Sequence, residues 1–176
     1  YGMTETNMIT SNPYNGERRP GTVGKPLPDV EIQINDSQTG RENADGEIGM
    51  IEVRGPNVFK GYWNMPDKTA LELKENGFFI TGDLGKLSSD GYLSIVGREK
   101  DLIISGGYNV YPKEVEDVLN EIEKIDETAV FGISDNDFGE RVVAAVVMTE
   151  NESFDKSETE IFVNDKLARY KQPKEY

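Results

Sequence analysis

Alternating apolar and polar positions dominate the first hundred residues and predict short β-strands. Val30 to Ile34 alternates as a half-buried strand does, and Met50 to Arg54 predicts a second strand. Phe78 to Leu87 and Tyr92 to Val96 flank the turn residues Ser89-Asp90-Gly91, which predicts a hairpin. These strands indicate a small β-barrel or sandwich.

A helical signal interrupts the strands. The loop that contains Gly61-Tyr62-Trp63 is followed by Asp67, which can cap a short helix that runs to about Leu73. Turn-forming residues fill the stretch from Asp36 to Gly46 and predict a loop between two of the strands.

Beyond Arg98 the pattern changes to mixed helix and strand. Leu102 to Ser105 predicts a short strand, Gly106-Gly107 a turn, and Pro112 suits the first position of a helix. Apolar residues then recur at i, i+3, i+4 and i+7, which places them on one helical face. They are Val115, Val118, Leu119 and Ile122.

Two strands and a second helix complete this half of the chain. Thr128 to Ile133 and Val142 to Met148 predict strands, with the turn residues 135–139 between them. Ser157 and Glu160 are spaced as a capping box that opens a helix. The apolar residues expected on one face of that helix are Val163, Leu167 and Tyr170.

The natural boundary therefore lies at about Lys100. A chain of 176 residues is long enough for one ordinary domain or two small ones. The predicted fold is mixed α and β, with a small β-barrel-like subdomain over residues 1–99 and a small α+β domain over residues 100–176.

Composition excludes several classes of function. A net charge of -14 argues against nucleic acid and anionic membranes as partners, because both bind clustered Lys and Arg. No stretch approaches the roughly 20 apolar residues that span a bilayer. The chain has no Cys and no His, which excludes thiolate metal sites and imidazole bases within it. A reducing, cytoplasmic location is compatible with the lack of Cys and is expected.

The residues Tyr1-Gly2-Met3-Thr4-Glu5 place an aromatic ring, hydroxyls and a carboxylate close together. These groups suit a nucleotide triphosphate, since a ring can stack on a base, hydroxyls can contact phosphates and a carboxylate can bind Mg²⁺. The chain begins with this motif and without an initiator Met, so we expect it to be a fragment.

Two further motifs follow in order. Asp83 ends the run Phe79-Ile80-Thr81-Gly82-Asp83, where a carboxylate can accept hydrogen bonds from a ribose. Arg98 follows Gly97 at a strand exit and can reach the same ribose and the phosphates. A turn-forming Asp and a surface ion pair are the simpler alternatives. The third motif runs from Gly97 to Glu116.

Together these motifs resemble the adenylate-forming superfamily of acyl-CoA synthetases, peptide-synthetase adenylation domains and luciferases. The resemblance covers essentially the whole chain, which matches the last third of such an enzyme. It implies that residues 1–99 end the AMP-binding N-terminal domain and that residues 100–176 form the mobile C-terminal domain, truncated before the catalytic lysine. The phosphate loop would lie before Tyr1 and the lysine after Tyr176, so the fragment alone is expected to be inactive.

For the first motifs the resemblance implies contacts to ATP and Mg²⁺. Tyr1 would pack on adenine, Thr4 would contact the α-phosphate and Glu5 would support Mg²⁺. Asp83 and Arg98 would bind the ribose.

For the third motif the resemblance implies a hinge and a CoA contact. Lys100 occupies the hinge position, about which the C-terminal domain rotates between two half-reactions. The first makes acyl-AMP from a carboxylate and ATP, and the second transfers the acyl group to CoA. The pantetheine arm of CoA would pass Gly106 and Gly107. Tyr108 stands where relatives often have Glu.

Within the family, the chain resembles malonyl-CoA synthetases in three runs of residues, Thr4 to Tyr14, Gly16 to Gly24 and Asn57 to Trp63. Met3, Arg18 and Arg19 are candidate substrate contacts, since the second carboxylate of a dicarboxylate needs a cationic partner. The alternative reading of the two arginines is as solvent-facing loop charges. A medium- or long-chain fatty-acid–CoA ligase is the other candidate enzyme, and a non-catalytic nucleotide- or protein-binding module is the alternative of another class. The sequence leaves the oligomeric state open.

Overall fold

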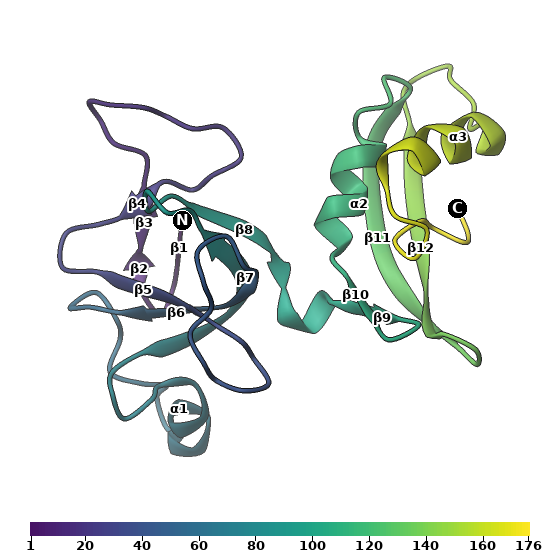
Figure 1. Ribbon diagram of the computed structural model, residues 1–176. Coiled ribbons are helices and arrows are strands. Elements are labelled where there is room, and N and C mark those ends of the chain that lie inside the picture. Colours follow the sequence, from purple (N-terminus) through teal and green to yellow (C-terminus); the bar gives the residue numbers. More distant parts are fainter. The chain divides into compact units, whose positions relative to one another are not determined.

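The computed structural model describes residues 1–176, which divide into two compact units, Tyr1–Glu99 and Lys100–Tyr176. Each unit combines antiparallel β-sheet with α-helix (Figure 1), so the predicted mixed α and β fold class is confirmed.

The first unit is built on an open, four-stranded antiparallel sheet with the order β5-β6-β7-β8. The strands are β5 (Glu31–Asn35), β6 (Gly49–Arg54), β7 (Phe79–Leu87) and β8 (Leu93–Arg98). All four were predicted, and β7 and β8 form the expected hairpin. The sheet does not close into a barrel, because β5 and β8 are both edge strands and a closed barrel with a filled interior needs about eight strands.

Two pairs of short strands precede this sheet. The first pair is β1 (Gly2–Met3) with β2 (Asn7–Met8), and the second is β3 (Thr10–Ser11) with β4 (Lys25–Pro26). The β1–β2 turn carries Thr4 and Glu5, so the first motif lies on a hairpin. Ile9, which lies between β2 and β3, packs with buried aliphatic side chains of the sheet into one core, namely Ile9, Ile34, Ile51, Val53 and Leu93.

Helix α1 (Pro66–Glu72) occupies the predicted place but begins differently. Asp67 lies inside the first turn, and the N-cap is Met65, which makes no side-chain capping bond. Pro66 explains the shift, since a proline is favoured at the first helical position and so moves the cap to the residue before it.

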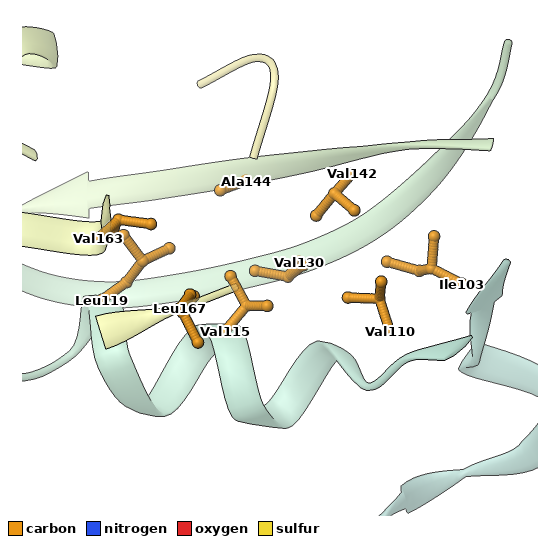
Figure 2. Packing of buried hydrophobic residues seen from close by; sticks show 9 residues of the cluster. All are labelled: Ile103, Val110, Val115, Leu119, Val130, Val142, Ala144, Val163 and Leu167. Carbon is orange, nitrogen blue, oxygen red and sulfur yellow. The ribbon is translucent and has the colours of Figure 1, made fainter. Parts of the chain in front are cut away.

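The second unit has a four-stranded antiparallel sheet with the order β10-β9-β12-β11. Its strands are β9 (Ile103–Ser105), β10 (Tyr108–Val110), β11 (Ile125–Asp135) and β12 (Gly139–Met148), and its helices are α2 (Pro112–Leu119) and α3 (Lys156–Lys166). Figure 2 shows the side chains of Val115 and Leu119 on α2 pointing toward the strand pair β11–β12. The buried core residues are Ile103, Val110, Val115, Leu119, Val130, Val142, Ala144, Val163 and Leu167.

The helix boundaries in this unit differ in detail from those predicted. Asp155, rather than Ser157, caps α3, and its carboxylate accepts a hydrogen bond from the Glu158 N–H at 3.0 Å. The expected capping box with Glu160 is therefore wrong by two residues, because an equally good capping side chain occurs one position before Lys156. Ile122 follows the end of α2 yet still packs on the core.

Tyr170 lies beyond the last residue of α3, so it does not extend the apolar face of that helix. Its ring stacks on the ring of Tyr108 with 4.8 Å between their centroids. The pairing depends on a contact between segments far apart in sequence, which helical periodicity does not report.

Candidate functional site

The Thr81-Gly82-Asp83 sequence forms a bulge in β7. A single residue of β6, Ile51, lies opposite these three residues. The Thr81 hydroxyl donates to the Ile51 carbonyl at 2.8 Å and accepts from the Asp83 N–H at 3.1 Å. Gly82 has a φ of +76°, a conformation that glycine adopts without steric cost. The motif therefore fixes the direction of the Asp83 side chain.

Asp83 is only 7% exposed, and its two carboxylate oxygens contact two different side chains. The Tyr1 hydroxyl donates to Oδ2 at 2.5 Å, and Nε of Arg98 lies 3.3 Å from Oδ1. Arg98 is the direct cross-strand partner of Asp83 between β7 and β8. Hydrogen bonds and a neighbouring cation offset the cost of burying a carboxylate. The fold thus brings together Tyr1, Asp83 and Arg98 from the first two motifs and the start of the third.

Tyr1 is a proton donor in this cluster. Burial, and then its hydrogen bond to the carboxylate of Asp83, raise the pKa of the Tyr1 hydroxyl far above its usual value. The phenol therefore stays protonated at neutral pH. The Arg98 side chain is 59% exposed, so guanidinium N–H groups remain available for a ligand beside the buried carboxylate. A carboxylate acceptor next to a multi-donor cation is chemically suited to a sugar diol that carries a phosphate.

Glu5 contacts the hydroxyl of Tyr62, which also contacts the carboxylate of Glu72. The Tyr62 hydroxyl lies 3.1 Å from Oε1 of Glu5 and 2.5 Å from Oε2 of Glu72. Burial first, and then both hydrogen bonds, raise the pKa of Tyr62 above its usual value. Thr4, next to Glu5, is exposed and makes no side-chain hydrogen bond. No local sequence signal indicates the Glu5–Tyr62 contact, which joins residues separated by 57 positions.

The acidic residues of the chain supply no complete metal site. No group of three or more His, Cys, Asp or Glu side chains could hold a metal ion. Glu5 is half-buried and one of its carboxylate oxygens accepts from Tyr62. A single partly exposed carboxylate fits Mg²⁺ that arrives with nucleotide phosphates, because Mg²⁺ is usually held by one or two carboxylates together with phosphate oxygens and water.

The three candidate substrate residues lie in different surroundings. Met3 is half-buried against the core of the first unit. Arg18 is exposed and has no carboxylate partner. Arg19 pairs with Glu17 at 3.3 Å and with Asp90 at 2.8 Å. Of the two arginines, only Arg18 is therefore free to meet a further carboxylate.

The Arg19–Asp90 pair gives a pH-dependent prediction. Hydrogen bonds from Arg19, and then from Ser88, lower the pKa of Asp90 from 3.8 to about 2. A carboxyl group with a lower pKa in the folded state stabilises the fold above its unfolded pKa, and this contribution is lost as the pH falls from about 4 to about 2. In Arg19→Ala we expect the pKa of Asp90 to return toward 3.8, measured by NMR titration.

Acid unfolding provides the second measurement for this pair. The stability difference between the wild-type chain and Arg19→Ala should shrink as the pH drops below about 4. Arg18→Ala is the matched control, because Arg18 has no partner. A stability difference that stays constant from pH 6 to pH 2 would contradict the assignment.

In the second unit, Gly106 and Gly107 form the turn between β9 and β10, as predicted. Their φ angles are +59° and +81°, so glycine is favoured at both positions. The Gly106 N–H donates to the Phe138 carbonyl at 2.8 Å, which attaches this turn to the loop between β11 and β12.

A pocket of about 460 Å³ lies beside this turn. Aromatic rings and cations share its wall, and its lining residues are Ser105, Gly106, Tyr108, Phe138, Arg169, Tyr170 and Lys174. Phe138 and Arg169 carried no signal in the sequence, because they reach the pocket from separate loops. Exposed rings next to two cations suit a ligand that has both an apolar arm and anionic groups.

Lys100 lies in the short 3₁₀ turn Glu99–Asp101, where the two compact units meet in sequence. Its side chain is exposed and makes no ion pair.

No helix in the structure has the length and apolar character needed to cross a membrane.

Family models match most of the chain. Residues 1–63 match the AMP-binding enzyme family, and residues 114–176 match the AMP-binding enzyme C-terminal domain. The solved structure of ATP-bound MatB from Rhodopseudomonas palustris has a TM-score of 0.96 and 53% identity, and the alignment covers 99% of this chain and 35% of that chain.

Two curated relatives are CoA ligases. The long-chain-fatty-acid–CoA ligase of Bacillus subtilis is 43% identical over 177 residues, which cover 100% of this chain and 31% of that ligase. The malonate–CoA ligase of Arabidopsis thaliana is 41% identical over 185 residues, which cover 98% of this chain and 30% of that ligase. The chain spans about a third of the length of these relatives. It belongs to the AMP-binding enzymes.

Proposed function

We propose that the chain is the C-terminal part of an ATP-dependent acid–thiol ligase that activates a carboxylate as acyl-AMP and transfers the acyl group to CoA. The observation that carries the proposal is the buried carboxylate of Asp83 between Tyr1 and Arg98. In the proposed enzyme, Asp83 accepts hydrogen bonds from the ribose of ATP, and Arg98 donates to the ribose and the phosphates. Residues 1–99 then belong to the AMP-binding domain, and residues 100–176 to the mobile domain.

The first motif supplies the phosphate contacts in this proposal. The Thr4 hydroxyl donates a hydrogen bond to the α-phosphate, Tyr1 packs beside adenine, and Glu5 would hold Mg²⁺. When bound, Mg²⁺ would neutralise part of the negative charge on the phosphates. The chain's own side chains act by binding and orientation, which suits a reaction that depends on positioning and charge neutralisation.

The pocket beside Gly106 and Gly107 is the proposed CoA contact. Two glycines in a tight turn let a narrow apolar arm approach the backbone closely. The stacked rings of Tyr108 and Tyr170 provide an apolar wall, while Arg169 and Lys174 provide positive charge for the phosphates of CoA. In the proposed enzyme, this contact holds CoA for the step in which the thioester forms.

Malonate is the proposed acyl substrate. The 41% identity to a malonate–CoA ligase and the unpaired charge of Arg18 support a short dicarboxylate. The 43% identity to a long-chain-fatty-acid–CoA ligase supports the second candidate, a medium- or long-chain fatty acid.

A cytoplasmic location remains a prediction.

A substrate panel tests both the reaction and the acid. With the full-length enzyme we expect AMP release that requires ATP, CoA and an acid together. The kcat/KM should be at least about tenfold higher for malonate than for octanoate or palmitate, because a site that pairs with a second carboxylate rejects acids that lack it. Arg18→Ala should reduce the rate with malonate more than the rate with octanoate.

The outcomes of this panel separate the candidates. A clear preference for octanoate or palmitate would transfer the proposal to the fatty-acid ligase. Failure of every acid to release AMP from an enzyme that still binds ATP would favour a non-catalytic nucleotide-binding module.

A further inference from the structure

The Tyr62 hydroxyl lies between two carboxylates that come from distant parts of the first unit. It is 2.5 Å from Oε2 of Glu72 and 3.1 Å from Oε1 of Glu5. A phenol has one proton to donate, so the two carboxylates share it, with the shorter contact to Glu72. Glu5 therefore has a fixed neighbour on one oxygen, while its second oxygen has no hydrogen-bond partner.

Backbone and ring contacts hold Tyr62 in this place. Its N–H donates to the Thr69 hydroxyl at 2.9 Å, and the Phe59 N–H donates to the Glu5 carbonyl at 2.8 Å. The Tyr62 ring meets the Phe59 ring edge-on at 4.8 Å, and the Lys68 ammonium lies 4.1 Å from the centre of the Tyr62 ring. Helix α1 and the loop before it thus present the hydroxyl to Glu5 from a fixed position.

We propose that Tyr62 is a positioning residue for the Glu5 carboxylate and that Glu72 holds the Tyr62 hydroxyl in place. This inference rests on the proposed function, in which Glu5 holds Mg²⁺ that arrives with ATP. A free Glu side chain loses rotamer freedom when it binds a cation, and a hydrogen bond that fixes the carboxylate beforehand reduces this loss. Tyr62 orients one oxygen of Glu5 and leaves the other for the metal.

The first test is the Mg²⁺ dependence of acyl-AMP formation by the full-length enzyme. For Tyr62→Phe we expect the Mg²⁺ concentration at half-maximal rate to rise about tenfold, with kcat at saturating Mg²⁺ within about twofold of wild type, as expected on loss of an outer-shell partner of a metal ligand. Tyr14→Phe is the matched control, because Tyr14 is 89% exposed and hydrogen-bonds to nothing. An unchanged Mg²⁺ dependence in a stably folded Tyr62→Phe enzyme would overturn the inference.

A second readout is independent of turnover. Mn²⁺ prefers the same oxygen ligands as Mg²⁺ and can be followed by electron paramagnetic resonance in the presence of ATP. Tyr62→Phe should weaken Mn²⁺ binding to the ATP-loaded enzyme by a similar factor, whereas ATP binding without metal should stay unchanged. Equal weakening of ATP binding with and without metal would indicate a general loss of structure and overturn the positioning role.

Glu72 is tested by two variants that lose the same charge. Glu72→Gln keeps an acceptor for the Tyr62 hydroxyl, whereas Glu72→Ala removes it. We expect a larger shift in Mg²⁺ dependence for Glu72→Ala than for Glu72→Gln. Equal shifts would mean that Glu72 acts only through its charge, which overturns its assigned role. A wild-type enzyme that binds ATP but forms no acyl-AMP at any Mg²⁺ concentration would instead overturn the proposed function, and this inference with it.

Discussion

Replacing Asp83 by alanine in the full-length ligase is expected to lower kcat/KM for ATP about 100-fold, since two hydrogen bonds to a charged acceptor at roughly 1.5 kcal/mol each would be lost. The effect should be large because Asp83 is only 7% exposed and the bulge at Gly82 fixes the direction of its side chain. Steady-state kinetics with varied ATP provides the measurement.

Two controls make this result specific. Asp90→Ala removes an aspartate of the same unit that pairs with Arg19 on the surface, and it should leave the KM for ATP within about twofold, as for most surface substitutions. Thermal unfolding must accompany the kinetics, because Asp83→Ala also removes the partner of Tyr1 and Arg98. If both aspartate variants changed the KM for ATP equally, Asp83 would not be the ribose acceptor.

Placing proline at Lys100 is expected to suppress thioester formation by the full-length enzyme about 100-fold, because small misplacements of reacting groups cost rates of that order. Proline fixes φ near -65° and disfavours the helical conformation of the residue before it, so backbone rotation at the 3₁₀ turn Glu99–Asp101 would be restricted. Formation of acyl-AMP should fall less. Rapid-quench assays of the two half-reactions measure the difference.

Lys100→Ala is the matched variant for this experiment. It removes the same charge but leaves φ free, so both half-reactions should stay close to wild type if Lys100 acts as a pivot. Misfolding is excluded by comparing the melting temperatures of the two variants. A stably folded Lys100→Pro enzyme that made acyl-CoA at the wild-type rate would move the proposed pivot to another residue.

The sequence alone predicted most elements of both units, because strand alternation and helical periodicity are local consequences of which face is buried. Strand β5, for example, follows from the alternation of Val30 to Ile34, and α2 follows from Pro112 and the apolar stripe after it. Helix starts were less certain, since Asp155 and Ser157 both carry side chains able to cap α3 and only the folded backbone selects one.

The sequence also indicated Asp83 and Arg98, and their pairing needed only the β7–β8 hairpin, whose two strands are close in sequence. The partner of Asp83 from the other end of the unit, Tyr1, is 82 residues away, and the contact between them comes from tertiary packing. Position in a motif predicts which residues carry chemistry, but not which distant hydrogen bonds fix them.

Tertiary structure by itself decided three features of the candidate sites. It paired Arg19 with Asp90, 71 positions away, while leaving Arg18 free, although the two arginines are neighbours in sequence. It gathered aromatic rings and cations from separate loops around the turn between β9 and β10. It also brought the hydroxyl of Tyr62 between two carboxylates. Each of these depends on contacts between segments far apart in sequence, for which local periodicity and spacing carry no information.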